Sequence, residues 1–422
     1  MGLDTSMKHC SYFWKLTVLV IGFLLIAGPV ASETNKVEGS KPLVILISLD
    51  GFRPAYLSST DTPNLIKLAG KGAIAKGLLS SFPSVTFPNH VTLVTGQTPD
   101  HHGIVNNIMK DSEIDHDFSI GSREAIEDSR WWAESRPIWV SMRQQGKIAS
   151  TIFWPGSETE ILGLRPNDWL RYEHSLSHEA RLQTLLSWLD RPTSERPDLV
   201  TLYFSDVDSA GHAAGPESDA VKVAVRKVDA TLGKLVKTLD ERGMLLATTF
   251  VIVSDHGMAS VSPKGAIRVQ GVLSDFPAST WDWLGTTAAV RLNGESLAGV
   301  MKSLKSLEHV TCWPKSEVPE RFRFGSHRRI PDIVCLADSG YFVADRIALV
   351  NPGGMHGYDP SLTEMHGILI VTGPEIVPMK LGLIQNTEVY GLLAHLVKII
   401  PNQNDGLDTL YMNVTVGGFT VQ

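Results

Sequence analysis

The chain has 422 residues, of which 43% are hydrophobic and 20% are charged, and its formal net charge is −7. This composition excludes a disordered chain, which would be poor in apolar residues and more highly charged. The acidic balance argues against a general nucleic-acid binder, and three cysteines are too few for a scaffold built from disulfides. We therefore expect a globular protein with a large core, and we interpret it as an enzyme.

The first 32 residues have the pattern of a secretory signal peptide. Lys8 and Lys15 supply positive charge, residues 16–27 form an apolar run, and small residues offer a cleavage site after Ser32. An uncleaved anchor is the alternative, but the apolar run is shorter than the ~20 residues that span a bilayer. We expect a periplasmic or secreted protein without a stable membrane anchor, whose catalytic domain is residues 33–422.

Short apolar runs alternate with longer amphipathic segments along the rest of the chain. The runs predict strands at 43–48, 148–153, 199–204, 249–253, 332–336 and 367–372. Helical spacing predicts helices at 63–71, 177–190, 219–242 and 387–399. This alternation indicates an α/β fold, with a mostly parallel central sheet and helices on both faces. Residues 258–330 lack clear periodicity, and we interpret them as an insertion over the active site.

Carboxylates follow three of the predicted strands. Asp50 comes directly after the first strand, Asp206 and Asp208 follow the strand at 199–204, and Asp255 follows the strand at 249–253. In open α/β sheets, ligands bind outside the carboxyl ends of the strands. A single acid after a strand is often a turn or helix-cap residue. Three such endings, two of them with a nearby histidine, favour a shared site.

The histidines near these acids form a pattern suited to zinc. Asp208 and His212 have a spacing that places both side chains on one face of a helix. His256 directly follows the third acid, and His356 lies in a glycine-rich loop. Imidazoles combined with carboxylates suit zinc better than magnesium or calcium, which prefer oxygen ligands. Other histidines, including His90, lack such a context, and we expect core or surface roles for them.

A hydroxyl precedes one further apolar segment. Thr86 lies two residues before Pro88, which fits the first turn of a helix. A hydroxyl at a helix N-terminus lies among free backbone N–H groups, which favour an anion such as phosphate. From these residues alone, Thr86 is either a nucleophile or a simple helix N-cap.

Taken together, the motifs resemble those of nucleotide pyrophosphatase/phosphodiesterases, and most closely the bacterial single-domain members. The resemblance extends over residues 42–410 and is carried by segments 47–53, 86–90, 95–96, 102–107, 153–157, 208–216, 254–258 and 356–359. It implies the fold of the alkaline phosphatase superfamily and two zinc ions. One ion would be held by Asp50, Thr86, Asp255 and His256, and the other by Asp208, His212 and His356.

The same resemblance implies how a nucleotide is bound. Asn107 matches an asparagine that binds a phosphoryl oxygen, and Phe87 matches an aromatic residue beside the nucleotide base. Tyr172 is the expected second face of this aromatic clamp, with Trp169 as the alternative. No sequence-specific binding of nucleic acid is expected.

Two cysteines remain once the signal peptide is removed, Cys312 and Cys335. In an oxidising compartment they form either one bridge or two buried thiols. They resemble the paired cysteines of close bacterial relatives, which implies the bridge.

The implied activity is the cleavage of phosphodiester and pyrophosphate bonds of nucleotides, through a phospho-threonine at Thr86, to release nucleoside 5′-monophosphates. The alternative is a phosphomonoesterase or phosphonate hydrolase on the same fold. A monoesterase needs an additional cation for the second negative charge of its substrate. No arginine or lysine is adjacent to Thr86, and we expect Arg53 to form a surface ion pair.

Overall fold

The computed structural model describes residues 41–345, 353–407 and 409–415. The expected signal peptide lies outside these residues. Among the described segments, no helix combines the length and apolar character needed to cross a bilayer.

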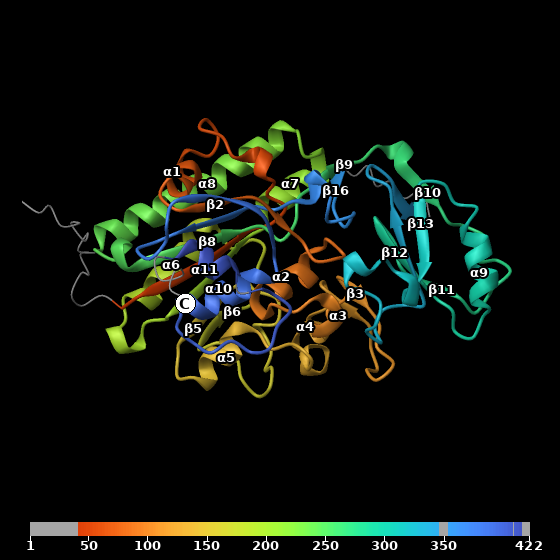
Figure 1. Ribbon diagram of the computed structural model, residues 1–422, viewed down its shortest axis with the longest axis horizontal. Coiled ribbons are helices and arrows are strands. Elements are labelled where there is room, and N and C mark those ends of the chain that lie inside the picture. Colours follow the sequence, from red (N-terminus) through yellow and green to blue (C-terminus); the bar gives the residue numbers. More distant parts are fainter. Residues whose placement is uncertain (1–40, 346–352, 408, 416–422) are drawn as a thin grey trace, which may run out of the picture. The chain divides into compact units, whose positions relative to one another are not determined.

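An eight-stranded sheet forms the centre of the α/β part (Figure 1). Its strands, in spatial order, are β18 (Met379–Gln385), β2 (Ala73–Leu79), β17 (Leu369–Thr372), β8 (Thr248–Val253), β1 (Leu43–Leu49), β7 (Leu199–Phe204), β5 (Ala149–Ile152) and β6 (Asp168–Leu170). Strands β8, β1, β7, β5 and β6 are parallel to one another. Strand β17 is antiparallel to both of its neighbours. The expected mostly parallel sheet is confirmed, although β2, β6 and β18 were not expected.

Helices cover both faces of this sheet because its central strands are apolar on both sides. In β1, Val44 and Leu46 belong to one hydrophobic cluster, whereas Ile45 and Ile47 belong to another. The first cluster includes helices α2 (Thr86–Thr95), α5 (Ile138–Gln144) and α10 (Glu388–Leu396). The second includes α1 (Pro63–Ala69), α6 (His178–Leu189) and α8 (Asp219–Glu241). Further helices are α3 (Pro99–His102), α4 (Arg123–Glu127), α7 (Asp206–Ala214), α9 (Leu297–Leu304) and α11 (Thr409–Val414).

A second, antiparallel sheet occupies the segment that we interpreted as an insertion (Figure 1). Its order is β11 (Thr280–Trp283), β12 (Thr287–Arg291), β14 (Ile333–Ala337) and β13 (Val310–Pro314). The strand predicted at 332–336 therefore belongs here and not to the central sheet, and the insertion extends beyond residue 330. The expected disulfide is confirmed, because Cys312 on β13 is bonded to Cys335, directly opposite on β14.

A buried arginine joins this insertion to the α/β part. Arg329 is fully buried, and its Nε donates to the Asp111 carboxylate at 2.6 Å. Its Nη1 donates to the carbonyl oxygens of Gly103 and Trp131 at 2.7 and 2.8 Å. The desolvated guanidinium is thus compensated by a charged partner and by backbone acceptors, as a buried charge requires.

Candidate active site

The three acids that follow strands meet because β8, β1 and β7 are adjacent and parallel. Asp50 and Asp255 are almost completely buried beside the imidazole of His256. Nε2 of His256 lies 3.5 Å from Oδ1 of Asp50 and 3.0 Å from Oδ2 of Asp255. These three residues form one group whose ligand atoms lie close enough to share a metal ion.

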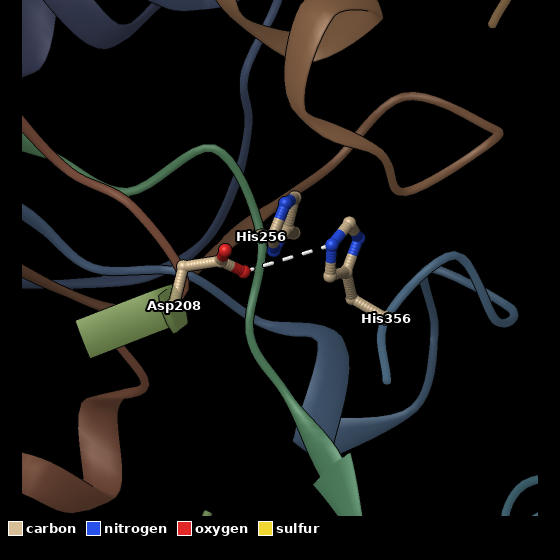
Figure 2. Close-up of side chains that lie close together, drawn as sticks. All are labelled: Asp208, His256 and His356. Atoms are coloured by element: carbon tan, nitrogen blue, oxygen red, sulfur yellow. Dashed lines mark ion pairs between the residues drawn. The ribbon is translucent and has the colours of Figure 1, made fainter. Parts of the chain in front are cut away.

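A second group contains Asp208, His356 and again His256 (Figure 2). Nε2 of His356 lies 3.6 Å from Oδ1 of Asp208, which is on α7. Nε2 of His212, one turn further along α7, lies 3.3 Å from the same oxygen. The structure therefore brings the expected ligands together. His256 belongs to both groups, whereas we expected it in the first group only.

A glycine allows α7 to approach the end of β1. Gly51 has a φ of +67°, and a Cβ atom there would lie 3.0 Å from Cα of Asp208. A side chain at this position would be strained and would push the two segments apart. The glycine that follows Asp50 therefore helps to bring Asp50 and Asp208 to the same site.

The hydrogen bonds of the three histidines orient Nε2 toward the carboxylates. The Nδ1 atoms of His212, His256 and His356 lie 3.0, 2.9 and 2.9 Å from the carbonyl oxygens of Gly354, Gly257 and Ser84. A carbonyl oxygen can only accept a hydrogen bond, so Nδ1 of each ring carries the hydrogen and donates it. This arrangement fixes ring orientation and leaves Nε2 to face a metal, as is common for histidine ligands.

Unpartnered oxygens and perturbed pKa values support a cation site. Oδ1 of Asp50, Oδ1 of Asp208 and Oδ2 of Asp255 are buried and make no hydrogen bond. Burial, and then the charges of Asp255 and Asp208, raise the pKa of Asp50 well above its usual range. Burial alone would lower the pKa of His256, but the neighbouring carboxylates, Asp255 first, raise it to about 10. Positive charge is thus stabilised here, and the donor set fits zinc.

Thr86 is the first residue of α2, and its hydroxyl faces the same groups. Val85 is the N-cap residue, and no side chain caps the helix, which excludes the simple N-cap role for Thr86. Oγ1 of Thr86 lies 3.3 Å from Nε2 of His256. The hydroxyl therefore lies at the positive end of a helix and beside the first metal-binding group.

Asn107 lies next to this helix N-terminus. Its Oδ1 accepts a hydrogen bond from the backbone N–H of Phe87 at 2.9 Å. Because the amide oxygen accepts this hydrogen bond, Nδ2 remains available as a donor to another group. The geometry suits a group that donates to an oxygen bound near Thr86.

An aromatic pocket of about 220 Å³ opens beside Thr86. It is lined by Phe87 and Tyr172 together with Ile120, Phe153, Trp154 and Tyr203, and Asp50 and Asp208 also reach it. Trp169 is not among the lining residues, since it lies on β6 with the guanidinium of Arg165 5.2 Å above its ring. Of the two alternatives, Tyr172 is the one that lines the same pocket as Phe87.

Two residues of the site were not expected from the sequence. The hydroxyl of Tyr203 donates to Oδ2 of Asp50 at 2.6 Å. His90, for which we expected a core or surface role, is fully buried, with Nδ1 2.9 Å from the carbonyl oxygen of Thr86 and 3.4 Å from Oδ2 of Asp255. Both are core-like residues by local pattern, and only the close approach of β1, β7 and α2 shows that they contact the site.

Comparison with known proteins identifies the class to which this fold and site belong. Residues 44–359 match the family model described as type I phosphodiesterase/nucleotide pyrophosphatase. The chain is 34% identical over 395 residues to bovine ectonucleotide pyrophosphatase/phosphodiesterase family member 3, covering 86% of this chain and 43% of that protein. The chain belongs to the type I phosphodiesterase/nucleotide pyrophosphatase family, a family of hydrolases.

Further relatives extend the comparison. An uncharacterised pyrophosphatase/phosphodiesterase of Schizosaccharomyces pombe is 32% identical over 402 residues, which cover 91% of this chain and 82% of that protein. Among solved structures, murine ectonucleotide pyrophosphatase/phosphodiesterase 5 was determined as an inactive threonine-to-alanine variant in complex with AMP. It superposes on this chain with a TM-score of 0.83 at 29% sequence identity, and the match covers 89% of this chain and 100% of that chain. The implied fold is thereby confirmed. These relatives are eukaryotic and give no support to the expected closest resemblance to the bacterial members of the family.

Proposed function

We propose that this chain hydrolyses phosphodiester and pyrophosphate bonds of nucleotides and releases nucleoside 5′-monophosphates through a phospho-threonine intermediate. The observation that carries the proposal is the position of the Thr86 hydroxyl, at the start of α2 and 3.3 Å from Nε2 of His256. The family comparisons support the reaction class. The murine relative supports nucleotide binding, since it is described as a complex with AMP.

Two zinc ions are the cofactors that these residues fit. Asp50, Thr86, Asp255 and His256 would hold one ion, and Asp208, His212 and His356 would hold the other. When bound, such a pair lowers the pKa of a coordinated hydroxyl and neutralises charge on the attacking and leaving oxygens of an in-line displacement. The two groups of ligand atoms, joined at His256, support a two-metal arrangement.

Thr86 is the nucleophile in this proposal. A bond forms between Oγ1 and phosphorus while the bond from phosphorus to the leaving oxygen breaks, so that the phosphoryl group and its nucleoside are held on Thr86. Water then displaces Thr86 and releases the nucleoside monophosphate. Asn107 and the backbone N–H of Thr86, at the start of α2, donate to the phosphoryl oxygens as negative charge develops on them.

The pocket composition favours diesters over monoesters. Phe87 and Tyr172 would stack on a nucleobase, and stacking tolerates any base. Among the residues that line the pocket there is no lysine or arginine. Arg53, three residues after Asp50, pairs with Glu217 at 2.9 Å, as expected. A monoester with nearly two negative charges would therefore lack a compensating side chain.

Turnover and metal content test this function together. We expect about two zinc equivalents per chain and efficient hydrolysis of the p-nitrophenyl ester of thymidine monophosphate. Thr86→Ala should retain fold and zinc but lose on the order of 10³-fold or more in rate, whereas Thr86→Ser should keep part of the activity because a hydroxyl remains. More efficient hydrolysis of p-nitrophenyl phosphate than of the thymidine diester would contradict the proposal and favour the monoesterase.

We also propose that the chain is exported, after cleavage following Ser32. The signal-like pattern of residues 1–32 supports this proposal, and so does the Cys312–Cys335 disulfide, which is typical of oxidising compartments. N-terminal sequencing of the protein recovered outside the cytosol should begin at residue 33. An intact N-terminus on that protein would contradict cleavage.

A further inference from the structure

The hydroxyl of Tyr203 contacts the carboxylate of a metal-binding residue. Tyr203 is on β7, paired in register with Ser48 of β1, two residues before Asp50. Its hydroxyl donates to Oδ2 of Asp50 at 2.6 Å, which is a short hydrogen bond. The two side chains are thus held together by the pairing of the two central strands.

This hydrogen bond leaves the other carboxylate oxygen of Asp50 for a different partner. Oδ1 is buried, accepts no hydrogen bond and lies 3.5 Å from Nε2 of His256. The terminal torsion of an aspartate is broad, so its carboxylate rotates readily unless one oxygen is held. Tyr203 therefore determines which oxygen of Asp50 faces the group of metal ligands.

The ring of Tyr203 has a separate set of contacts. It lines the aromatic pocket and meets the ring of Tyr172 edge to face, with centroids 6.2 Å apart. It also meets the ring of His90, with centroids 5.2 Å apart. The ring thus belongs to the substrate pocket, whereas the hydroxyl contacts a residue of the metal-binding group. Removing the hydroxyl oxygen alone therefore tests the second role without changing the first.

We infer that Tyr203 is a positioning residue for the metal centre, whose hydroxyl holds Asp50 so that Oδ1 is directed at the metal. The inference rests on the proposed zinc-dependent function and adds to it a residue outside the expected ligand set. Loss of an outer hydrogen-bond partner of a metal ligand typically costs 10- to 100-fold in metal affinity or activity.

The test is the Tyr203→Phe variant, which removes the hydroxyl and keeps the ring. Tyr390→Phe is the matched control, because Tyr390 is also buried but its hydroxyl accepts from the backbone N–H of Asn402, away from the metal ligands. Zinc affinity is measured by competition with a chromogenic chelator, and kcat and KM are measured with the p-nitrophenyl ester of thymidine monophosphate. Thermal melts of the zinc-depleted proteins verify that each variant folds.

We expect one of the two zinc ions to bind about 10- to 100-fold more weakly in Tyr203→Phe and with unchanged affinity in Tyr390→Phe. At a zinc concentration that does not saturate the weakened site, kcat should fall while KM changes little, since the aromatic ring is retained. Equal zinc affinity in wild type and Tyr203→Phe would overturn this inference but not the proposed function. Equal weakening in both variants would also overturn it, whereas wild-type protein that binds no zinc would overturn the proposed function itself.

Discussion

Replacing Phe87 with alanine should weaken nucleotide substrates more than small diesters. Phe87 lines the pocket beside Thr86, together with Tyr172. Stacking of a base on an aromatic side chain contributes roughly 1–3 kcal/mol, which corresponds to about 5- to 150-fold in kcat/KM. The assay compares the p-nitrophenyl ester of thymidine monophosphate with methyl p-nitrophenyl phosphate, which has the same leaving group and no base.

The control for this experiment is Trp169→Ala, an aromatic truncation outside the pocket lining. It should leave the ratio of the two kcat/KM values unchanged. Phe87 also packs against the rings of Phe118 and Trp132, with centroids 6.0 and 6.4 Å away. Its truncation therefore lowers stability as well, and the assay must be run well below the melting temperature of the variant. An equal loss for both diesters in Phe87→Ala would refute the stacking role.

Further predictions concern the metal centre, the insertion and its disulfide. Asp255→Asn should reduce bound zinc, measured by elemental analysis, because it removes a buried anionic ligand; unchanged zinc content would contradict its role. Arg329→Ala should lower the free energy of unfolding by up to about 3–5 kcal/mol in urea titrations, because it breaks a buried ion pair and leaves Asp111 to pair with the more exposed Arg328; a loss below about 1 kcal/mol would show that the buried ion pair is dispensable. Burial alone would raise the pKa of Asp111, but hydrogen bonds from Arg329, from the Glu113 backbone and from Arg328 together lower it to about 2. The contribution of this carboxylate to stability is therefore complete above the unfolded pKa of about 3.9 and is lost as the pH falls toward 2. In Asp111→Asn, the free energy of unfolding should no longer fall with pH through protonation of this carboxylate. A pH profile of stability equal to that of the wild type would exclude a contribution of Asp111. Reduction of Cys312–Cys335 should cost on the order of 3 kcal/mol by the loop-entropy model, and alkylation of the unreduced protein at either cysteine would contradict the bridge.

The central strands could be predicted from the sequence because their apolar runs are continuous. Strands β1, β7 and β8 are buried along their whole length except for Tyr203, as expected for strands covered on both faces. Strand β18 was missed because it lies at the sheet edge and is mostly exposed, so its residues do not form an apolar run. The run at 332–336 was placed in the wrong sheet, since a local pattern does not show which partner a strand will pair with.

The candidate metal ligands could also be predicted, because acids and histidines at strand ends stand out from their neighbours. The contacts of Tyr203 and His90 could not, since an aromatic residue in a strand and a histidine in an apolar helix both have the local pattern of core residues. Their roles depend on distances between segments that are more than 100 residues apart in the sequence, such as Tyr203 and Asp50. Only the register of β1 against β7 makes that contact evident.

The stereochemical course at phosphorus tests the central proposal most directly. The substrate is a single diastereomer of the p-nitrophenyl ester of thymidine 5′-phosphorothioate, hydrolysed in water enriched in oxygen-18. Attack by Thr86 followed by attack of water comprises two in-line displacements, each of which inverts phosphorus. We therefore predict net retention of configuration in the nucleoside phosphorothioate product. Net inversion would mean that water attacks the substrate directly, and it would contradict a covalent intermediate on Thr86.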